Sequence, residues 1–456
     1  MMATAERPAL YRSLLASALG LAVAVQAAVA DDWADDDWAD DWEEEPAARL
    51  PFTVSGFVEG AGGLHLRNNP AVDDRLGKRY NLAETRAQLG VDGDTRGVDY
   101  RLRADLVGDA VDDELRAELR EAVVQFGVGD RTDVRAGRQV LTWGTGDLLF
   151  INDLFPKDWE SFLIGRDEDY LKAPSDALRT TWYGDVWNVD LVWSPLFRED
   201  NYVDGDRLSY FGGPAGQTAE PISDRSVEPD SFPDDGELAL RLATRRDGTE
   251  YALYGYRGFY PQPDDRRALA ENRFGYPRLN VFGASVRRAL GPGIGHAEVG
   301  WYDSVDNRSG DQALLPHSQA RGLVGYEWEA VTNLTVGAQY YLEWTDRHAR
   351  LEDNLRAVEA ETGISGLTAA AGDELRHVIT TRLTYSQLRG DLIWSLFVFA
   401  SPSDRDAYLR PSLRYRYSDA LTVSAGANVF AGSSAETFFG QFERDGNVYL
   451  RARYRY

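Results

Sequence analysis

Apolar and polar residues alternate along much of the chain, and the last ten residues show this most clearly. In Asn447–Tyr456, one parity holds Val448, Leu450, Ala452, Tyr454 and Tyr456. The other parity holds Asn447, Tyr449, Arg451, Arg453 and Arg455. A period of two is that of a β-strand with two different faces. The pattern therefore predicts a terminal strand with one apolar, aromatic face and one basic face.

Segments with the same period recur from residue 52 onward. In 333–345, for example, Leu334, Val336 and Ala338 alternate with Thr335 and Gln339. The series predicts eighteen strands, near 52–66, 83–91, 98–106, 122–128, 134–140, 177–184, 187–195, 237–245, 250–259, 278–289, 294–304, 319–329, 333–345, 375–386, 391–400, 407–417, 420–430 and 446–456.

The connections between these segments alternate in length. Short Gly/Asp/Asn turns of hairpin type occur at one end of the strands, for example at 92–97, 129–132 and 387–390. The other end has long loops at 142–176, 196–235, 260–276, 305–317, 346–374 and 431–445. A soluble sandwich has no reason to sort its loops in this way. The pattern predicts an all-β fold: a closed antiparallel transmembrane β-barrel of about 18 strands with short periplasmic turns and long outer loops.

The first thirty residues have the layout of an export signal. Arg7 and Arg12 precede an apolar run, and Ala28-Val29-Ala30 supplies a small-residue cleavage site. The alternative is an N-terminal membrane anchor. No other window approaches the roughly 20 apolar residues of a spanning helix. We expect a signal peptide at 1–30, a periplasmic tail at 31–50 and the barrel at 51–456.

The segment 31–45, DDWADDDWADDWEEE, combines ten carboxylates with three tryptophans and has no basic residue. Its charges repel one another and little of it can be buried. We expect a solvated tail. The alternative is a docking segment, either for a periplasmic partner or for the basic lumen of the protein itself.

Composition narrows the function. The chain has 49 basic and 74 acidic residues, a formal net charge of −25, which argues against a nucleic-acid partner. Cysteine is absent, so disulfides and thiolate metal sites are excluded. The 23 tyrosines, 18 phenylalanines and 12 tryptophans fit a barrel with aromatic girdles. No metal, phosphate-loop or nucleotide motif is present, so we expect no cofactor.

The loop 142–176 combines apolar and charged side chains. It holds large apolar side chains such as Phe150, Phe155 and Phe162, which a loop surrounded by water could not bury. We expect it to fold into the barrel and to form a constriction with its charged residues Asp147, Asp153, Lys157, Asp158, Glu160 and Arg166. The alternative is an external loop or a lid packed on its neighbours.

Arginines gather on the polar faces of several predicted strands. We expect a basic wall along the pore, here called the arginine wall, formed by Arg101, Arg103, Arg135, Arg410, Arg414, Arg416, Arg451, Arg453 and Arg455. Such a wall would attract an anionic solute and pass it along. The alternative is that these arginines pair with carboxylates and only brace the lumen. The candidate partners are Glu84, Asp99, Asp105, Glu121, Glu298 and Glu343.

Two short runs carry a family resemblance. Gly137-Arg138-Gln139, followed by Trp143-Gly144 and an Asp-rich segment with Phe-Pro, resembles a large family of bacterial outer-membrane porin-like proteins, many of unassigned function. Thr437-Phe438-Phe439-Gly440 is similar to the same group. The strand number also resembles that of alginate exporters and carboxylate channels. The resemblance implies a channel or transporter in the outer membrane of a Gram-negative bacterium.

Three functions compete at this point. The first is passive diffusion of small polar solutes, with anionic or carboxylated molecules as candidate cargo. The second is an outer-membrane component of an export or efflux system, for polysaccharide or hydrophobic cargo, that docks a periplasmic partner through the acidic tail. The third is an enzymatic barrel. It would need a serine and a histidine brought together, and the sequence has five histidines and no Gly-x-Ser-x-Gly elbow. We expect no enzymatic activity.

Overall fold

The computed structural model describes residues 52–72, 79–211, 217–220, 222, 225–268, 271, 273–364, 366–368 and 371–456. The predicted signal peptide and acidic tail lie outside the described residues. Among the residues that are described, no helix is long and apolar enough to cross a membrane.

Eighteen long strands form one sheet, as the alternating pattern predicts. Their bounds are β1 (Phe52–His65), β2 (Leu82–Thr95), β3 (Val98–Asp109), β4 (Glu114–Gly127), β5 (Thr132–Val140), β6 (Pro174–Tyr183), β7 (Asn188–Ser194), β11 (Glu237–Arg246), β12 (Thr249–Phe259), β14 (Arg278–Leu290), β15 (Gly293–Ser304), β16 (Gln319–Val331), β17 (Leu334–Thr345), β18 (Leu375–Gln387), β19 (Leu392–Ser401), β20 (Asp406–Arg416), β21 (Leu421–Gly432) and β22 (Asn447–Arg455).

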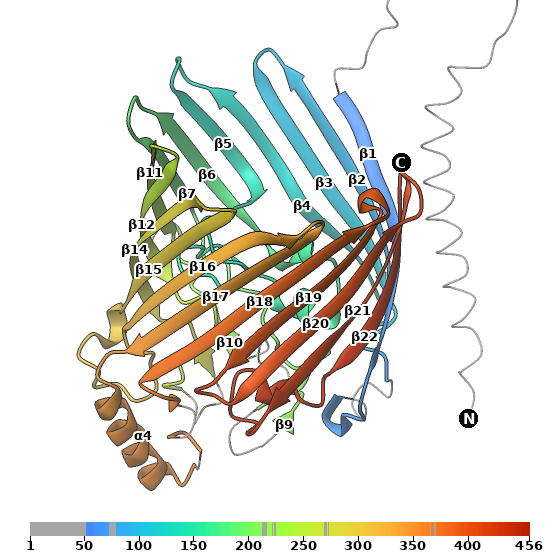
Figure 1. Cartoon of the computed structure of the whole chain (residues 1–456). Helices are drawn as coiled ribbons and strands as arrows, with labels where there is room; N and C mark the ends of the chain where they lie inside the picture. The colour runs from blue at the N-terminus through green and yellow to red at the C-terminus, as the bar shows by residue number, and fades with distance from the viewer. Residues whose placement is uncertain are drawn as a thin grey trace, which may run out of the picture.

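The last strand closes the sheet on the first. β22 pairs antiparallel with β1, with Tyr454 opposite Val58 and Leu450 opposite Gly62. Each of the other long strands pairs antiparallel with its two neighbours along the chain, so the sheet is a closed barrel. In Figure 1 the short turns lie at the top and the longer loops, with helix α4 (His348–Thr362), lie at the bottom. The predicted closed antiparallel barrel is confirmed.

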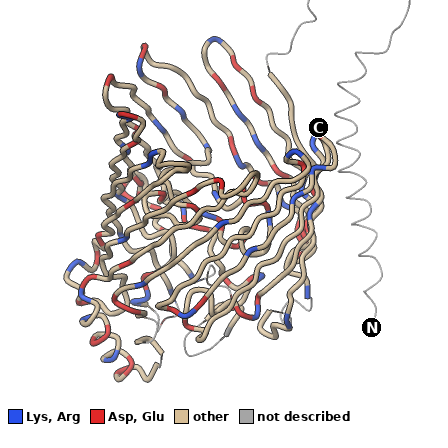
Figure 2. The backbone as a smooth tube through the Cα atoms, in the orientation of Figure 1, with Lys and Arg blue, Asp and Glu red and all other residues tan. Residues whose placement is uncertain are grey.

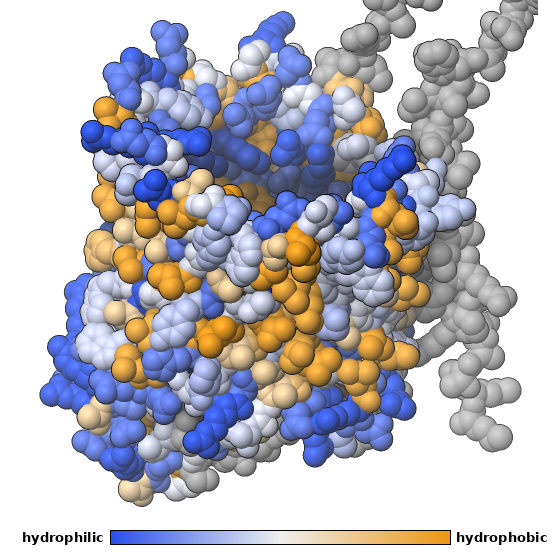
Figure 3. All heavy atoms as spheres, viewed as in Figure 1, coloured by the Kyte–Doolittle hydropathy of each residue, from blue (hydrophilic) through white to orange (hydrophobic). Residues whose placement is uncertain are grey.

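The two faces of the wall differ as the alternation requires. Apolar side chains of the strands point outward and remain exposed, as in Val299 at 57% and Val324 at 56%. On the face seen in Figure 3, hydrophobic residues gather in a band across the middle of the wall, with hydrophilic residues at both ends. Charged residues on the opposite parity, such as Asp105 and Glu298, are buried inside. This arrangement suits a wall with lipid outside and a polar lumen inside.

One strand is longer than the alternation predicted. We expected a strand at 122–128, whereas β4 begins eight residues earlier, at Glu114. A register shift explains the difference: Arg103 lies opposite Glu121, but the next residue, Ala104, lies opposite Leu119. This bulge inserts one extra residue, Arg120, and reverses the parity of the strand on either side of it.

The remaining elements belong to the connections. The helical ones are α3 (Trp159–Ile164), α4 and the 3-10 turns η1 (Glu168–Leu171), η5 (Val305–Asn307), η7 (Leu388–Gly390) and η8 (Gly440–Phe442). The short strands are β8 (Tyr210–Phe211), β9 (Gln217–Thr218), β10 (Ser226–Val227) and β13 (Phe274–Gly275). Two outer connections, 110–113 and 402–405, are as short as the periplasmic turns. Helix α4 lies in the connection that was predicted as the long loop 346–374.

Candidate functional site

The connection between β5 and β6, residues 141–173, lies inside the barrel (Figure 1). It is the third outer connection along the chain, and we call it the third loop. On one side, the Tyr302 hydroxyl of β15 donates a 2.5 Å hydrogen bond to its Ile151 carbonyl. On the other, the Asn428 side chain of β21 donates to its Leu163 carbonyl at 2.8 Å. The third loop therefore crosses the lumen from wall to wall.

Apolar side chains of the third loop fill part of the lumen. Ile151, Phe162 and Ile164 are buried in the same core cluster as inward-facing wall residues such as Tyr408 and Phe430. The Phe162 ring meets Tyr408 edge-on, with ring centroids 6.0 Å apart. Burial of such side chains contributes about 1.5–3 kcal/mol each, which holds the loop against the wall.

A short helix within the third loop is set by its two ends. The Asp158 carboxylate caps the N-terminus of α3 by accepting a 2.7 Å hydrogen bond from the Ser161 backbone N–H. Gly165 ends the helix with a φ of 94°, a left-handed conformation that glycine adopts without steric cost. Asn201 from the loop after β7 also donates to the Asp158 carboxylate, at 2.8 Å. These contacts position the residues that follow the helix.

A buried ion network fixes the third loop to the β2–β3 side of the wall. The Arg166 Nε donates to the Glu84 carboxylate of β2 at 2.9 Å, and the Arg166 guanidinium also donates to the Ser161 hydroxyl at 2.8 Å. Arg207, from the loop after β7, donates to the Asp109 carboxylate of β3. The side chains of these ion-paired residues are 8% exposed or less, so little water reaches the pairs.

Arg207 and Arg86 of this network were not among the residues predicted from the sequence, whereas Asp105 was predicted as a candidate carboxylate partner. Arg207 is one of the few basic residues in an acidic loop and has no periodic pattern around it. Arg86 and Asp105, by contrast, lie on polar strand faces, where alternation marks both as inward-pointing. They are joined by a 2.6 Å ion pair.

The predicted constriction residues separate into distinct roles. Asp147 accepts hydrogen bonds from the Arg382 guanidinium of β18, at 2.6 and 2.9 Å. Lys157 and Asp153 form a 3.1 Å ion pair that is buried within the loop. Glu160 is buried beside Arg207, with 3.4 Å between charged atoms. Among those of the six predicted residues that form ion pairs, Asp147 has the most exposed side chain. Asp158, Glu160 and Arg166 belong to helix α3 or to the ion network that anchors it.

Most members of the arginine wall have carboxylate partners. Arg101 and Arg103 bind Asp92, at 2.8 and 2.6 Å. Arg416 binds Asp391 at 2.6 Å. Of the partners considered from the sequence, Glu121 lies 3.8 Å from Arg101, whereas Glu84 and Asp105 bind the other arginines described above. Pairing of this kind is what the bracing alternative expected.

Three members of the arginine wall differ. Within the described part of the chain, no carboxylate oxygen lies within 4 Å of a charged nitrogen of Arg135, Arg414 or Arg455. All three lie toward the periplasmic ends of their strands. Figure 2 shows basic and acidic positions interspersed along the strands.

Two adjacent carboxylates of the third loop meet the remaining members of the arginine wall. Glu168 lies between two arginines, 3.2 Å from Arg382 and 3.1 Å from Arg410. Asp167 also lies between two arginines, 2.7 Å from Arg451 and 3.4 Å from Arg453. We call Arg382, Arg410, Arg451 and Arg453 the four luminal arginines. Arg382 was not predicted, although it lies on the same inward parity of β18 as Arg376 and Thr380.

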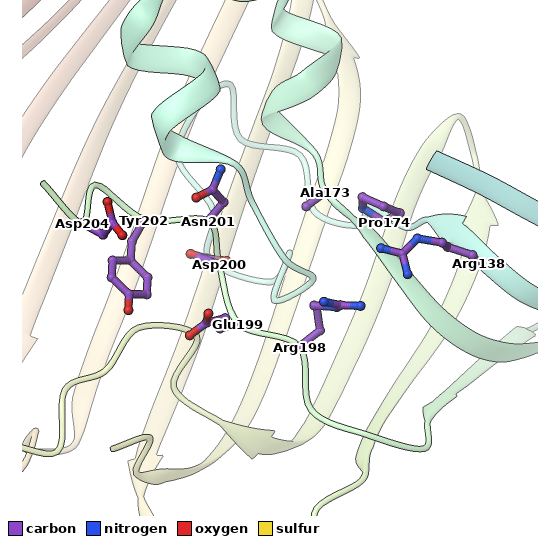
Figure 4. A pocket seen from close by; sticks show the side chains of 9 residues that line it. All are labelled: Arg138, Ala173, Pro174, Arg198, Glu199, Asp200, Asn201, Tyr202 and Asp204. Atoms are coloured by element: carbon purple, nitrogen blue, oxygen red, sulfur yellow. The ribbon is translucent and has the colours of Figure 1, made fainter. Parts of the chain in front are cut away.

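A cavity of about 230 Å³ lies between the outer ends of β5 and β6 and the loop after β7. Figure 4 shows Arg138 and Arg198 toward one end and Glu199 and Asp204 toward the other. Burial, reinforced by the neighbouring Glu228, raises the pKa of Glu199 to about 7. The cavity is therefore lined by both signs of charge, and one of its carboxyls titrates near neutral pH.

The histidines have ordinary partners where these are described. His296 contacts the Gln339 amide, His377 contacts the Tyr340 hydroxyl, and His317 contacts a backbone carbonyl. None of these three contacts joins a histidine to a serine hydroxyl, as a hydrolytic triad would require.

No protein-family model matches the chain, and no curated protein matches it in sequence. Solved structures share its fold. Acinetobacter baumannii OccAB3 matches with a TM-score of 0.52 and 9% identity, over 89% of this chain and 99% of that chain. Pseudomonas aeruginosa OccD3 (OpdP) matches with a TM-score of 0.51 and 10% identity, over 89% and 91%. Pseudomonas aeruginosa OccK11 (OpdR) matches with a TM-score of 0.50 and 10% identity, over 89% and 95%.

These structural neighbours are outer-membrane porins, so the fold is that of this class of barrel. With its apolar outer band, the barrel is that of a Gram-negative outer-membrane protein.

Proposed function

We propose that the chain is a porin-like outer-membrane channel for passive diffusion of small polar solutes, with a preference for anionic, carboxylated ones. The proposal includes membership of the large porin-like family that the runs around Gly137 and Thr437 resemble. An enzymatic function has no such support.

The observation that carries the proposal is the third loop crossing a polar lumen. An eighteen-stranded barrel is wide enough to leave an aqueous channel, so a loop across it decides what passes. Asp147 and Glu168 of this loop are each 41% exposed while they contact the wall. Water therefore reaches the charged side of the loop at the level where it meets the wall.

The anion preference rests on where the unpaired positive charge lies. Arg414 and Arg455 face the periplasmic half of the lumen on β20 and β22, which are separated by β21 alone, and Arg135 lies on β5. A guanidinium binds a carboxylate in a planar, bidentate geometry, which favours carboxylated solutes over other anions. Carboxylates neutralise the charge of the other arginines of the wall, so the anion preference depends on Arg135, Arg414 and Arg455.

Conductance in planar bilayers tests the proposal. Purified protein should form discrete channels, and the reversal potential in a KCl gradient should have the sign of an anion-selective pore. Replacing Arg135, Arg414 and Arg455 together by glutamine should reduce the selectivity without abolishing the channels. Protein that inserts but never conducts would refute the channel, and cation selectivity would refute the anion preference alone.

A further inference from the structure

We propose that the four luminal arginines form a binding site for a dicarboxylate, which the protein occupies with its own Asp167 and Glu168 when no solute is bound. The inference rests on the proposed channel function. A solute with two carboxylates would take the places of these two side chains and release the adjacent part of the third loop. The channel would then open in response to the solute that it carries.

The arrangement of the two loop carboxylates supports a dicarboxylate. Each of the two adjacent carboxylates lies between a pair of arginines: Glu168 between Arg382 and Arg410, and Asp167 between Arg451 and Arg453. These four guanidinium groups on β18, β20 and β22 also hold two other carboxylates, because Arg382 binds Asp147 and Arg453 donates to Glu59 of β1 at 2.8 Å. A flexible molecule with two carboxylates carries the same two charges.

Two of the four luminal arginines also have N–H donors that are not used. The buried Nε groups of Arg410 and Arg451 have no hydrogen-bond partner among the described residues. A buried guanidinium N–H without an acceptor is costly, so the site has capacity for a ligand oxygen that Asp167 and Glu168 do not supply. Arg410 is also stacked on the Phe162 ring, with its guanidinium carbon 4.1 Å from the ring centroid, and this contact holds it in place.

The third loop has two kinds of attachment, and only one can exchange with solute. The Arg166–Glu84 pair has side chains that are 8% and 3% exposed, whereas Glu168 is 41% exposed against Arg382 at 23%. Asp167 is intermediate, at 15% against Arg451 at 7%, so Glu168 exchanges first. Exposed ion pairs contribute little because water competes with them, so a dissolved carboxylate can replace Glu168. The buried anchor and the apolar core hold the rest of the loop during this exchange.

The test compares succinate with acetate in planar bilayers at constant ionic strength. In wild-type protein, replacing chloride with succinate should raise single-channel conductance along a saturating curve, and acetate should not. The double variant D167N/E168Q should conduct chloride better than wild type and should show no further rise with succinate. Arg410→Met should shift the half-maximal succinate concentration upward by roughly tenfold or more. Asp185→Asn, on an exposed periplasmic turn, is the matched control and should behave as wild type.

The outcomes separate the two proposals. If no variant conducts any ion, both the channel and the site are refuted. If wild type conducts chloride but succinate and acetate act alike, the dicarboxylate site is refuted and the channel stands. Glu168→Gln alone is the second variant, in case the double variant does not fold. An unchanged succinate response in this folded variant would also overturn the site.

Discussion

Arg166 and Glu84 are joined by a hydrogen bond of 2.9 Å across 82 residues of sequence. Glu84 lies on the second strand of the wall, and Arg166 directly follows the C-cap of the helix inside the lumen. This pair, with the buried arginines around it, ties the third loop to the β2–β3 side of the barrel. Along the adjoining wall, from β18 to β22, the loop is held by Asn428 and by the four luminal arginines.

The first prediction concerns this anchor. In Glu84→Gln, Arg166 loses its closest carboxylate and Arg207, which keeps Asp109, loses a second one at 3.8 Å, while both arginines remain buried. Breaking a buried pair in this way costs about 3–5 kcal/mol. The urea midpoint of the folded barrel in detergent should fall clearly. Arg131→Gln, which removes an exposed pair with Asp185, is the control and should cost about 0–1 kcal/mol. Equal midpoints for the two variants would show that the network does not anchor the loop.

The second prediction concerns the end of the luminal helix. A Cβ on Gly165 would lie 2.2 Å from Cδ1 of Tyr449, and the residue has a φ of 94°. Gly165→Ala therefore combines backbone strain of about 1–2 kcal/mol with overpacking of about 1–3 kcal/mol.

The control for this prediction is the other helix C-cap of the same kind. Gly363 ends α4 with a φ of 72°, and a Cβ there meets no atom within 4 Å. Gly363→Ala should therefore carry the strain without the clash. The thermal transition of the barrel, followed by its gel mobility, should fall much further for Gly165→Ala. Similar transitions would mean that α3 does not pack on β22 as described.

The third prediction is a pH dependence at the outer cavity. Burial raises the pKa of Glu199 to about 7, above its ordinary value of 4.5, because the charged form is disfavoured there. As the pH rises, the unfolded loop therefore releases this proton at a lower pH than the folded loop does. The contribution of Glu199 to the stability of the folded loop is fully present below about pH 4.5 and is lost as the pH rises through 7. Hydrogen exchange of residues 195–206, corrected for intrinsic rates, should show less protection at pH 8 than at pH 5.5.

Glu199→Gln should reduce this pH dependence, because the amide does not titrate. Asp200, whose pKa burial raises to about 6, should retain part of it. Glu250→Gln, at an exposed position on β12, is the control and should leave it intact. A drop in protection that persists unchanged in Glu199→Gln would assign the effect to another group.

Much of the fold could be predicted from the sequence because lipid and water act on opposite faces of every strand. Val324 and Leu450 face outward, and Glu298 and Arg451 face inward, as their parity indicates. The start of β4 was missed because a β-bulge changes which parity faces the lipid. The extra Arg120 at the bulge moves Leu115 and Leu119 onto the opposite parity from Ala122 and Val124, so a search with one fixed period detects only half of the strand.

The candidate site could be predicted only in part. Parity marks Arg410 and Arg451 as luminal, but their partners Glu168 and Asp167 lie in a loop without periodicity, 242 and 284 residues away. Long-range pairing of this kind depends on where the loop crosses the lumen, and no local pattern encodes that path. For the same reason Arg207 could not be assigned to the anchor from its own surroundings in the sequence.

The central claim is that the third loop controls passage through the barrel, and removing the loop tests it most directly. Val140 and Pro174 are paired in register at the ends of β5 and β6, so a tight turn can replace residues 141–173 while the wall stays closed. Single-channel conductance in KCl should then rise several-fold over wild type, because the segment that connects Tyr302 of β15 to Asn428 of β21 is removed. A folded loop-deleted barrel with wild-type conductance would contradict the account.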